Sequence, residues 1–242
     1  MKFIDKDLTN ELVKDAQQRL LKAKDYNSDP IVRDDIRKIY NGCCAYCESS
    51  FEEGAYFQIE HFYPKGLKKY KLLSKDIRNL HYSCQRCNNL KGTKNQEILS
   101  PNWFLYNGNW VLTRKEKISQ EIYYVGHMLY SRNTSDGSVD RGRNTIELFN
   151  LNNDNIKIRN NRSFLVESRL RTLNNVYNQL KCIKKLLSNY DILPCEINES
   201  IEILFNQVIY AVQPNAHYST MIIQNYGDII IKLLRIYVQI KK

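Results

Sequence analysis

Apolar residues recur every three or four positions near the start of the chain, which is the spacing of a helix with one buried face. This pattern predicts helices over residues 7–24 and about 30–41. Asp29 and Pro30 suit the N-cap and the first turn of the second helix, and Gly42 suits its end. The predicted buried faces comprise Leu8, Leu12, Ala16, Leu20 and Leu21 in the first helix, and Ile31, Val32, Ile36, Ile39 and Tyr40 in the second.

The last third of the chain repeats the helical spacing. It predicts one long helix over about 153–188, a second over about 196–212, and one or two further helices over 218–240 with Gly227 as the junction. A proline separates each of these predicted helices from the next. The last helix carries an apolar stripe that favours core packing, with a partner-facing surface as the alternative, and the stripe comprises Ile229, Leu233, Ile236 and Ile240.

The segment from residue 44 to 94 has a mixed pattern. We expect a cysteine-bearing turn, a strand that carries Glu60 and His61, a basic loop, a short strand near 79–83, and a helix that opens near Cys87. In this arrangement Asn88 lies in the first turn of the helix. The pattern therefore predicts a small two-stranded unit closed by a helix.

A hairpin is predicted after this segment. Asn107 and Gly108 lie between two aromatic runs within residues 101–112, which is a strong signal for a type I′ turn. Residues 114–140 show no clear period, and the polar stretch 131–139 is predicted as an exposed loop.

Together these elements predict an α+β protein: a ββα core with N-terminal helices and a mostly α-helical C-terminal part. We divide the chain into N-terminal helices (1–42), the core (43–100), a hairpin and connecting segment (101–140), and a helical region suited to partner docking (141–242).

Composition narrows the class of partner. The 242 residues are 43% hydrophobic, which is enough for a substantial core. The formal net charge of +10 favours a polyanion such as nucleic acid over a neutral small molecule.

No apolar run reaches the roughly 18 to 20 residues of a membrane-spanning helix, and the first residues lack the apolar stretch of a signal peptide. We therefore expect a cytoplasmic protein with no membrane partner, and the odd count of seven cysteines fits a reducing compartment.

Four cysteines have the spacing of a zinc site. Cys44 and Cys47 form one Cys-x-x-Cys pair, and Cys84 and Cys87 form a second. Two such pairs provide the four thiolates of a tetrahedral structural Zn²⁺, whereas disulfides or free thiols are the alternatives. The 36 residues between the pairs exceed the usual finger spacing, so this zinc would join the two ends of an inserted unit. The cysteines left outside this site are Cys43, Cys182 and Cys195.

The residues between the cysteine pairs suit phosphodiester hydrolysis, which needs a base for water and a cation for the phosphate charge. His61 has the pKa range of a general base at neutral pH. Glu60 and Asn88 offer oxygen ligands to one Mg²⁺ or Mn²⁺. Asn79 is predicted to bond the loop backbone and to orient His61. Taken one at a time, each of these residues is as well explained by a surface or structural role.

Positive charge surrounds these residues. Between residues 62 and 95 there are nine lysines and arginines and a single acid, Asp76. A basic segment around a hydrolytic site suits a nucleic acid, and a solvated loop is the alternative. The candidate nucleic-acid-binding residues are Lys65, Lys91, Lys94 and Arg86, of which Lys65 and Lys91 are favoured for phosphate.

The order Glu-His, Asn-Leu, Cys-x-x-Cys-Asn and Lys-Gly within residues 44–94 resembles the HNH endonucleases with the ββα-metal, or His-Me finger, fold. His61, Asn79 and Asn88 match the three positions that give the family its name. Two residues depart from the common pattern: Glu60 stands where Asp is more frequent, and Asn88 where His is more frequent. Both keep an oxygen or nitrogen ligand, but they put the preferred metal in doubt.

Further segments resemble the PtuB-type HNH proteins of Septu and retron-associated anti-phage systems, in which Glu before the first His is expected. These segments are 44–48, 59–65, 143–152 with Arg159, and 217–221.

This resemblance implies a defence effector that cleaves nucleic acid and is held by a PtuA-type ABC/SMC-like ATPase, with a retron reverse transcriptase and its RNA–DNA as a further candidate partner. Two alternatives stand beside it: a stand-alone HNH nuclease of a restriction system or mobile element, and a non-catalytic zinc module that binds nucleic acid or protein. The residues do not distinguish DNA from RNA as the substrate.

Overall fold

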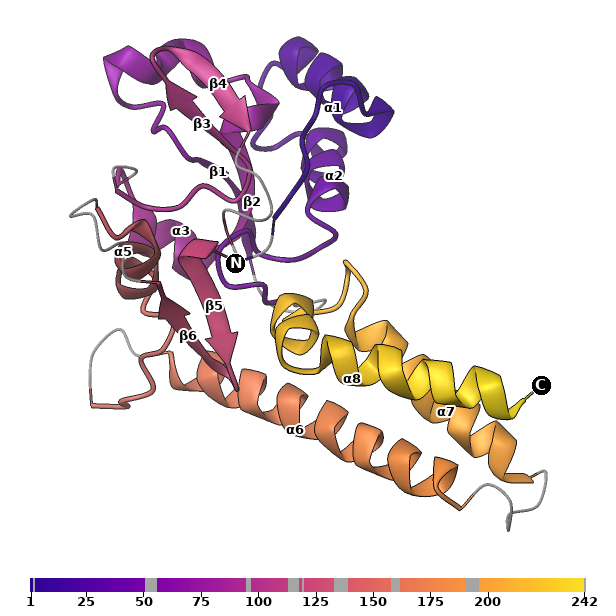
Figure 1. The fold of residues 1–242 in the computed structure, drawn as a ribbon. Coiled ribbons are helices and arrows are strands. Elements are labelled where there is room, and N and C mark those ends of the chain that lie inside the picture. Colours follow the sequence, from indigo (N-terminus) through magenta and orange to yellow (C-terminus); the bar gives the residue numbers. More distant parts are fainter. Residues whose placement is uncertain are drawn as a thin grey trace. The chain divides into compact units, whose positions relative to one another are not determined.

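The computed structural model describes residues 1, 3–50, 56–94, 97–112, 118, 120–132, 139–157, 162–189 and 196–241. These residues form helices and small antiparallel two-stranded sheets that are grouped along the chain, so the predicted α+β class is confirmed (Figure 1).

The chain forms two compact units. The first comprises Met1–Tyr123 with Leu129–Asn152, and the second comprises Tyr124–Met128 with Asn153–Lys242. The division into four segments stays a prediction, and the boundary between the units at Asn152 falls within its last segment, 141–242.

Two helices open the first unit: α1 (Glu11–Lys22) and α2 (Pro30–Ile39). The Asp29 side chain accepts hydrogen bonds from the backbone N–H groups of the first turn of α2, which confirms the predicted cap. The predicted buried face of α1 was right for Ala16 and Leu20, which are buried together with Val13. The side chains that point to solvent instead are Leu8, Leu12 and Leu21 in and before α1, and Ile31 in α2.

A two-stranded sheet and a short helix form the centre of the first unit, as predicted. Strand β1 (Phe57–His61) pairs antiparallel with β2 (Leu80–Cys84), so that Glu60 lies opposite His81. Helix α3 (Gln85–Lys91) follows β2 directly, and Asn88 is its fourth residue. The basic loop between the strands contains two short 3₁₀ helices, η1 (Lys68–Leu73) and η2 (Ile77–Asn79).

Two hairpins follow. Strands β3 (Trp103–Tyr106) and β4 (Asn109–Leu112) are joined by Asn107 and Gly108, whose φ values of 49° and 79° confirm the type I′ turn. The second hairpin, β5 (Ile122–Val125) and β6 (Met128–Ser131), lies where no pattern was predicted. Its signal was present, because β-branched and aromatic residues flank Gly126, which has a φ of 59°. Residues 133–138 of the predicted exposed loop lie outside the described residues.

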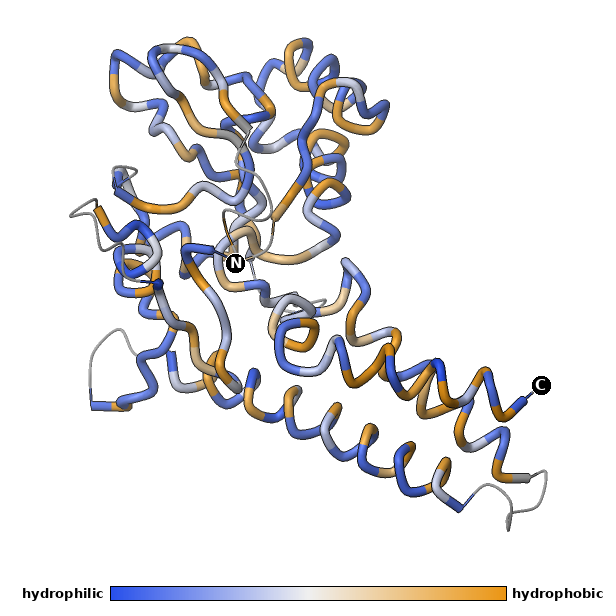
Figure 2. The backbone as a smooth tube through the Cα atoms, viewed as in Figure 1, coloured by the Kyte–Doolittle hydropathy of each residue, from blue (hydrophilic) through white to orange (hydrophobic). Residues whose placement is uncertain are grey.

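Helix α5 (Arg141–Leu148) completes the first unit, and three long helices form most of the second: α6 (Ser163–Leu187), α7 (Glu196–Ala211) and α8 (Ser219–Ile240). These three pack against one another (Figure 1). Hydrophobic and hydrophilic positions alternate along each of them, as expected for helices with one buried face (Figure 2).

Three details of the prediction for this bundle differ from the structure. Helix α6 begins at Ser163, ten residues later than predicted. Of the one or two helices predicted over 218–240 the structure has one, α8, which runs through Gly227 without a junction. Ile229 of the predicted stripe is 48% exposed, whereas the buried residues of α8 are Ser219, Met221, Ile222, Ile230, Leu233 and Tyr237. Among the described residues, none of the helices combines the length and the hydropathy needed to cross a membrane.

Candidate metal centre and active site

The four predicted zinc cysteines come together in the first unit. Cys44 and Cys47 precede β1, Cys84 ends β2, and Cys87 lies in α3. All four are buried, and their Sγ atoms lie within 4.8 Å of one another. The Sγ atoms of Cys47 and Cys84 are 3.9 Å apart, close to the roughly 3.8 Å between sulfurs that share a tetrahedral Zn²⁺ at about 2.3 Å. The donor set therefore fits zinc.

These thiols can ligate a cation only when they are deprotonated. Burial raises the pKa of the Cys44 and Cys87 thiols, whereas the hydrogen bond with Cys44 lowers the pKa of Cys84. A bound Zn²⁺ keeps coordinating thiols deprotonated in spite of such burial. When bound, it would join the segment before β1 to the junction of β2 and α3, which is a structural role.

His61 ends β1 with its side chain only 9% exposed. Its Nε2 lies 3.2 Å from the Ser74 carbonyl oxygen and 2.9 Å from the Tyr26 hydroxyl. Because a carbonyl oxygen only accepts, the contact with Ser74 places the ring proton on Nε2 and leaves Nδ1 with its lone pair. Burial lowers the pKa of His61 to about 4, so the ring is neutral at pH 7. Nδ1 is thus the nitrogen that can accept a proton.

Asn79 bonds the backbone around this histidine. Its Oδ1 accepts from the Tyr63 N–H at 2.8 Å, and its Nδ2 donates to the carbonyls of Tyr63 at 3.1 Å and Leu73 at 3.0 Å. Leu73 directly precedes Ser74, whose carbonyl contacts His61. The Asn79 side chain therefore fixes the end of β1 against the loop segment that contacts the ring.

Glu60 and Lys91 form a buried ion pair. The side chain of Glu60 is 3% exposed, and that of Lys91 is fully buried. The Lys91 Nζ lies 2.5 Å from Glu60 Oε1 and donates to the His61 carbonyl at 2.8 Å. Glu60 Oε2 accepts a hydrogen bond from the Tyr46 hydroxyl at 2.6 Å. Desolvation raises the pKa of Glu60, and the Lys91 charge opposes this effect. Lys91 therefore faces the protein interior, where a phosphate does not reach it in this conformation.

Asn88 has a different partner from Glu60. Its Nδ2 donates to Gln58 Oε1, and Gln58 and Glu60 lie on one face of β1 because side chains alternate along a strand. Helix α3 thus directs Asn88 and Lys91 to the same face. Both carboxylate oxygens of Glu60 are nevertheless engaged, by Lys91 and Tyr46. As arranged, Glu60 and Asn88 do not fit a shared Mg²⁺ unless these contacts rearrange.

His81 has a structural environment. It is fully buried, with Nδ1 3.1 Å from the Tyr46 hydroxyl and Nε2 3.3 Å from Asn102 Oδ1. Burial holds its pKa well below the ordinary value, so the ring stays neutral. Tyr46, Asn102 and Tyr26 were not identified from the sequence, because no local pattern separates a tyrosine or asparagine in such a network from one elsewhere.

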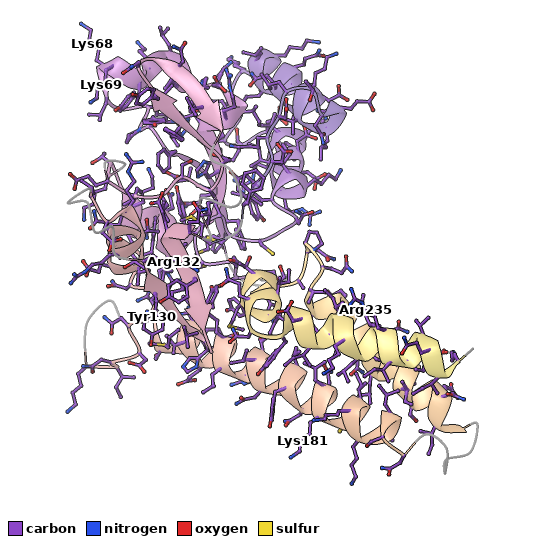
Figure 3. All side chains as sticks on the ribbon, viewed as in Figure 1. Lys68, Lys69, Tyr130, Arg132, Lys181 and Arg235 are labelled. Carbon is purple, nitrogen blue, oxygen red and sulfur yellow. The ribbon has the colours of Figure 1, made fainter. Side chains whose placement is uncertain are left out.

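The other candidate nucleic-acid ligands are exposed. Lys65, Arg86 and Lys94 all face solvent. The Lys65 ammonium lies 5.6 Å from the centre of the Tyr26 ring, beside His61. Lys68 and Lys69 project from η1 (Figure 3). Of these cations Lys65 lies near the candidate base, and it is where a polyanionic backbone would contact the protein.

Comparisons with known proteins agree with this geometry. Residues 44–94 match the sequence model of the family described as HNH endonuclease. The chain is 37% identical over 98 residues to the Septu protein PtuB of Bacillus thuringiensis, a match that covers 39% of this chain and 37% of that protein. It is 41% identical over 71 residues to the Septu protein PtuB of Bacillus mycoides (strain KBAB4), covering 25% of this chain and 24% of that protein.

The matches thus span little more than a third of the length of the first relative and about a quarter of the length of the second. No solved structure gives a significant match. Residues 44–94 therefore form an HNH endonuclease domain, and the chain is similar to the two PtuB proteins over 98 and 71 residues, respectively.

Proposed function

We propose that this chain is a nucleic-acid endonuclease that hydrolyses phosphodiester bonds with His61 as the general base. The observation that carries the proposal is the environment of the His61 ring within the HNH domain: Nε2 is held by the Ser74 carbonyl and Nδ1 keeps its lone pair. A neutral imidazole in a fixed orientation near the exposed Lys65 is suited to take a proton from an attacking water.

The residues around His61 have distinct tasks in this proposal. Nδ1 of His61 accepts the water proton, and the Ser74 carbonyl stabilises the Nε2–H of the charged ring that results. Asn79 maintains the loop that presents Ser74. Lys65, Arg86 and Lys94 contact phosphates of the substrate from the solvent side. When bound at the four cysteines, Zn²⁺ supplies fold stability and no reaction chemistry.

Dependence on Mg²⁺ or Mn²⁺ is proposed from the resemblance to the HNH endonucleases. Glu60 and Asn88 are the proposed ligands, but Glu60 is paired with Lys91. Cleavage with and without added Mg²⁺ or Mn²⁺ tests whether the cation is required.

The biological role that we propose is that of an anti-phage effector that acts with an ATPase of the PtuA type. It is supported by the similarity to two proteins named Septu protein PtuB, and neither name mentions a retron. The second unit, with its helices α6, α7 and α8, is proposed as the docking part for that partner. Co-purification of the full chain with a candidate ATPase, and loss of the complex when residues 153–242 are removed, would support this assignment.

A cleavage assay tests the nuclease proposal. Wild type and His61→Ala are incubated with plasmid, single-stranded DNA and total RNA, with and without added Mg²⁺ or Mn²⁺, and their zinc contents are compared. His127→Ala is the matched control, since His127 lies in the second unit and outside the HNH domain. We expect cleavage by wild type and His127→Ala and none by His61→Ala, with equal zinc in all three. Equal cleavage by His61→Ala would overturn the proposal.

An inactive wild-type protein calls for the same assay with the ATPase and ATP. Activity that appears only then supports an effector held in check by its partner. Continued inactivity, with zinc and nucleic-acid binding intact, would favour the non-catalytic zinc module.

A further inference from the structure

Tyr26 contacts the candidate base from outside the HNH domain. It lies between α1 and α2, it is 7% exposed, and its ring is tilted by 58° to that of His61 with 5.9 Å between the ring centres. Its hydroxyl meets Nε2 at 2.9 Å, beside the Ser74 carbonyl at 3.2 Å. A single partner would leave the imidazole free to pivot about one contact, whereas two oxygens from different segments define the plane of the ring.

The loop that carries Tyr26 is bound to the segment that carries Ser74. Lys75, the next residue along the chain, donates from Nζ to the Ala23 carbonyl at 2.7 Å and to the Leu21 carbonyl at 3.3 Å. These carbonyls lie at the end of α1 and just after it, before Tyr26. The two oxygen partners of Nε2 therefore belong to segments that are bonded to each other.

The same loop is also bound to the strand that carries His61. The Arg33 guanidinium donates to the Asn27 carbonyl at 3.2 Å and to the Phe57 carbonyl at 2.8 Å. Asn27 follows Tyr26 directly, and Phe57 begins β1. Arg33 thus links the loop that carries Tyr26 to the strand that carries His61. These hydrogen bonds hold the two residues together in addition to those of Lys75.

From these contacts we propose that Tyr26 is a positioning residue of the nuclease, which holds His61 so that Nδ1 faces the attacking water. The inference rests on the proposed function, and it extends the active site to the connection between α1 and α2, beyond residues 44–94. Tyr26 does not itself exchange a proton with the substrate. Its hydroxyl accepts the Nε2–H together with Ser74 and so restricts the ring.

Tyr26→Phe tests the proposal in the full-length protein. The variant removes only the hydroxyl, because the phenyl ring still packs against His61 and the Lys65 ammonium still lies over an aromatic face. Tyr70→Phe is the matched control: Tyr70 lies in the basic loop, next to the Tyr63 ring and Lys69, and no contact of its ring with His61 is described. Zinc content and Tm are measured for both variants.

Two readouts separate positioning from folding. In steady-state cleavage we expect Tyr26→Phe to lower kcat by about tenfold, with KM changed by less than about twofold. In ¹⁵N-edited NMR of the histidine rings, assigned with His61→Ala, we expect the His61 Nε2–H of Tyr26→Phe to exchange with water several-fold faster. Tyr70→Phe should match wild type in both.

The outcomes are distinct. A Tyr26→Phe variant with the kcat of Tyr70→Phe, or with an unchanged His61 ring signal, would overturn the positioning role. A change in KM alone would also overturn it, because that result assigns Tyr26 to substrate binding. If wild type cleaves nothing under any condition, the proposed function fails, while the ring signal still decides whether Tyr26 restrains His61.

Discussion

Removing the Lys91 ammonium should destabilise the fold. Lys91→Met keeps the length of the side chain but leaves the buried Glu60 carboxylate without its cation. Breaking a buried ion pair by removing one partner costs about 3–5 kcal/mol in unfolding free energy. The lost hydrogen bond to the His61 carbonyl adds about 1 kcal/mol. We therefore expect Lys91→Met to lose a large part of the stability of the chain.

A double-mutant cycle separates the pair from its surroundings. Glu60→Gln with Lys91→Met removes both charges and keeps the approximate volumes. Because the uncompensated carboxylate is then absent, we expect the double variant to be more stable than Lys91→Met, with a coupling energy of about 2–3 kcal/mol. Unfolding in urea, followed by circular dichroism at constant zinc, measures the four free energies.

Lys94→Met is the matched control, since Lys94 is an exposed lysine just after the same helix. We expect its stability to stay within about 0.5 kcal/mol of wild type. If it contacts a phosphate, its loss should lower the slope of log affinity against log salt by about one. The double variant should keep the wild-type slope. A Lys91→Met protein of wild-type stability and reduced salt slope would refute the buried-pair reasoning and restore Lys91 as a phosphate ligand.

Three further predictions concern the zinc site, the buried histidines and the loop. Cys84→Ser should lose the bound zinc and more than about 3 kcal/mol of unfolding free energy. The control Cys182→Ser, at an exposed cysteine, should lose neither. A Cys84→Ser protein that binds no zinc but melts like wild type would contradict a structural zinc. Because the pKa of His61 is lowered from 6.5 to about 4, the unfolded chain binds an extra proton between these values. The unfolding free energy should therefore fall as pH drops through this window, by up to about 3 kcal/mol for His61, with His81 acting in the same direction. Urea unfolding at pH 7.5 and pH 5, with zinc content monitored, measures this, and a flat profile would contradict it. Asn79→Ala removes three hydrogen bonds and should cost about 2–3 kcal/mol, measured by the same unfolding assay; a cost below about 0.5 kcal/mol would show that the loop does not depend on it.

Local signals explain why much of the first unit was predictable. The Asn107–Gly108 turn depends on two adjacent residues with positive φ, so the sequence is enough to specify it. The cysteine pairs likewise bring their own geometry, and they set the order of β1, β2 and α3 around them. By contrast, part of the buried face of a helix was predicted wrongly where neighbouring apolar residues compete for the buried side. In α1, tertiary packing buries Val13 and leaves Leu12 exposed, and no local pattern in the sequence predicts which of the two is buried.

The roles of charged and polar side chains were harder to predict, because they depend on partners that are distant in the sequence. Lys91 was assigned to phosphate from its position in a basic segment, yet its partner Glu60 lies 31 residues earlier, on the strand that α3 covers. The contact between Tyr26 and His61 joins residues 35 apart.

The arrangement of α3 has a consequence for catalysis by the HNH domain. One helix directs Lys91 to Glu60 and Asn88 to Gln58, while the His61 ring is held through Nε2 by Tyr26 and Ser74. The proposed base is thus held by protein groups, and the proposed cation ligands are also occupied by protein groups. Since the ammonium of Lys91 already balances the charge of Glu60, a divalent cation would have to compete with it, and its binding should be weaker than at a free carboxylate. Lys91→Met, if kept folded by its zinc, should then bind Mn²⁺ more tightly than wild type, which links the stability cycle to the chemistry of the site.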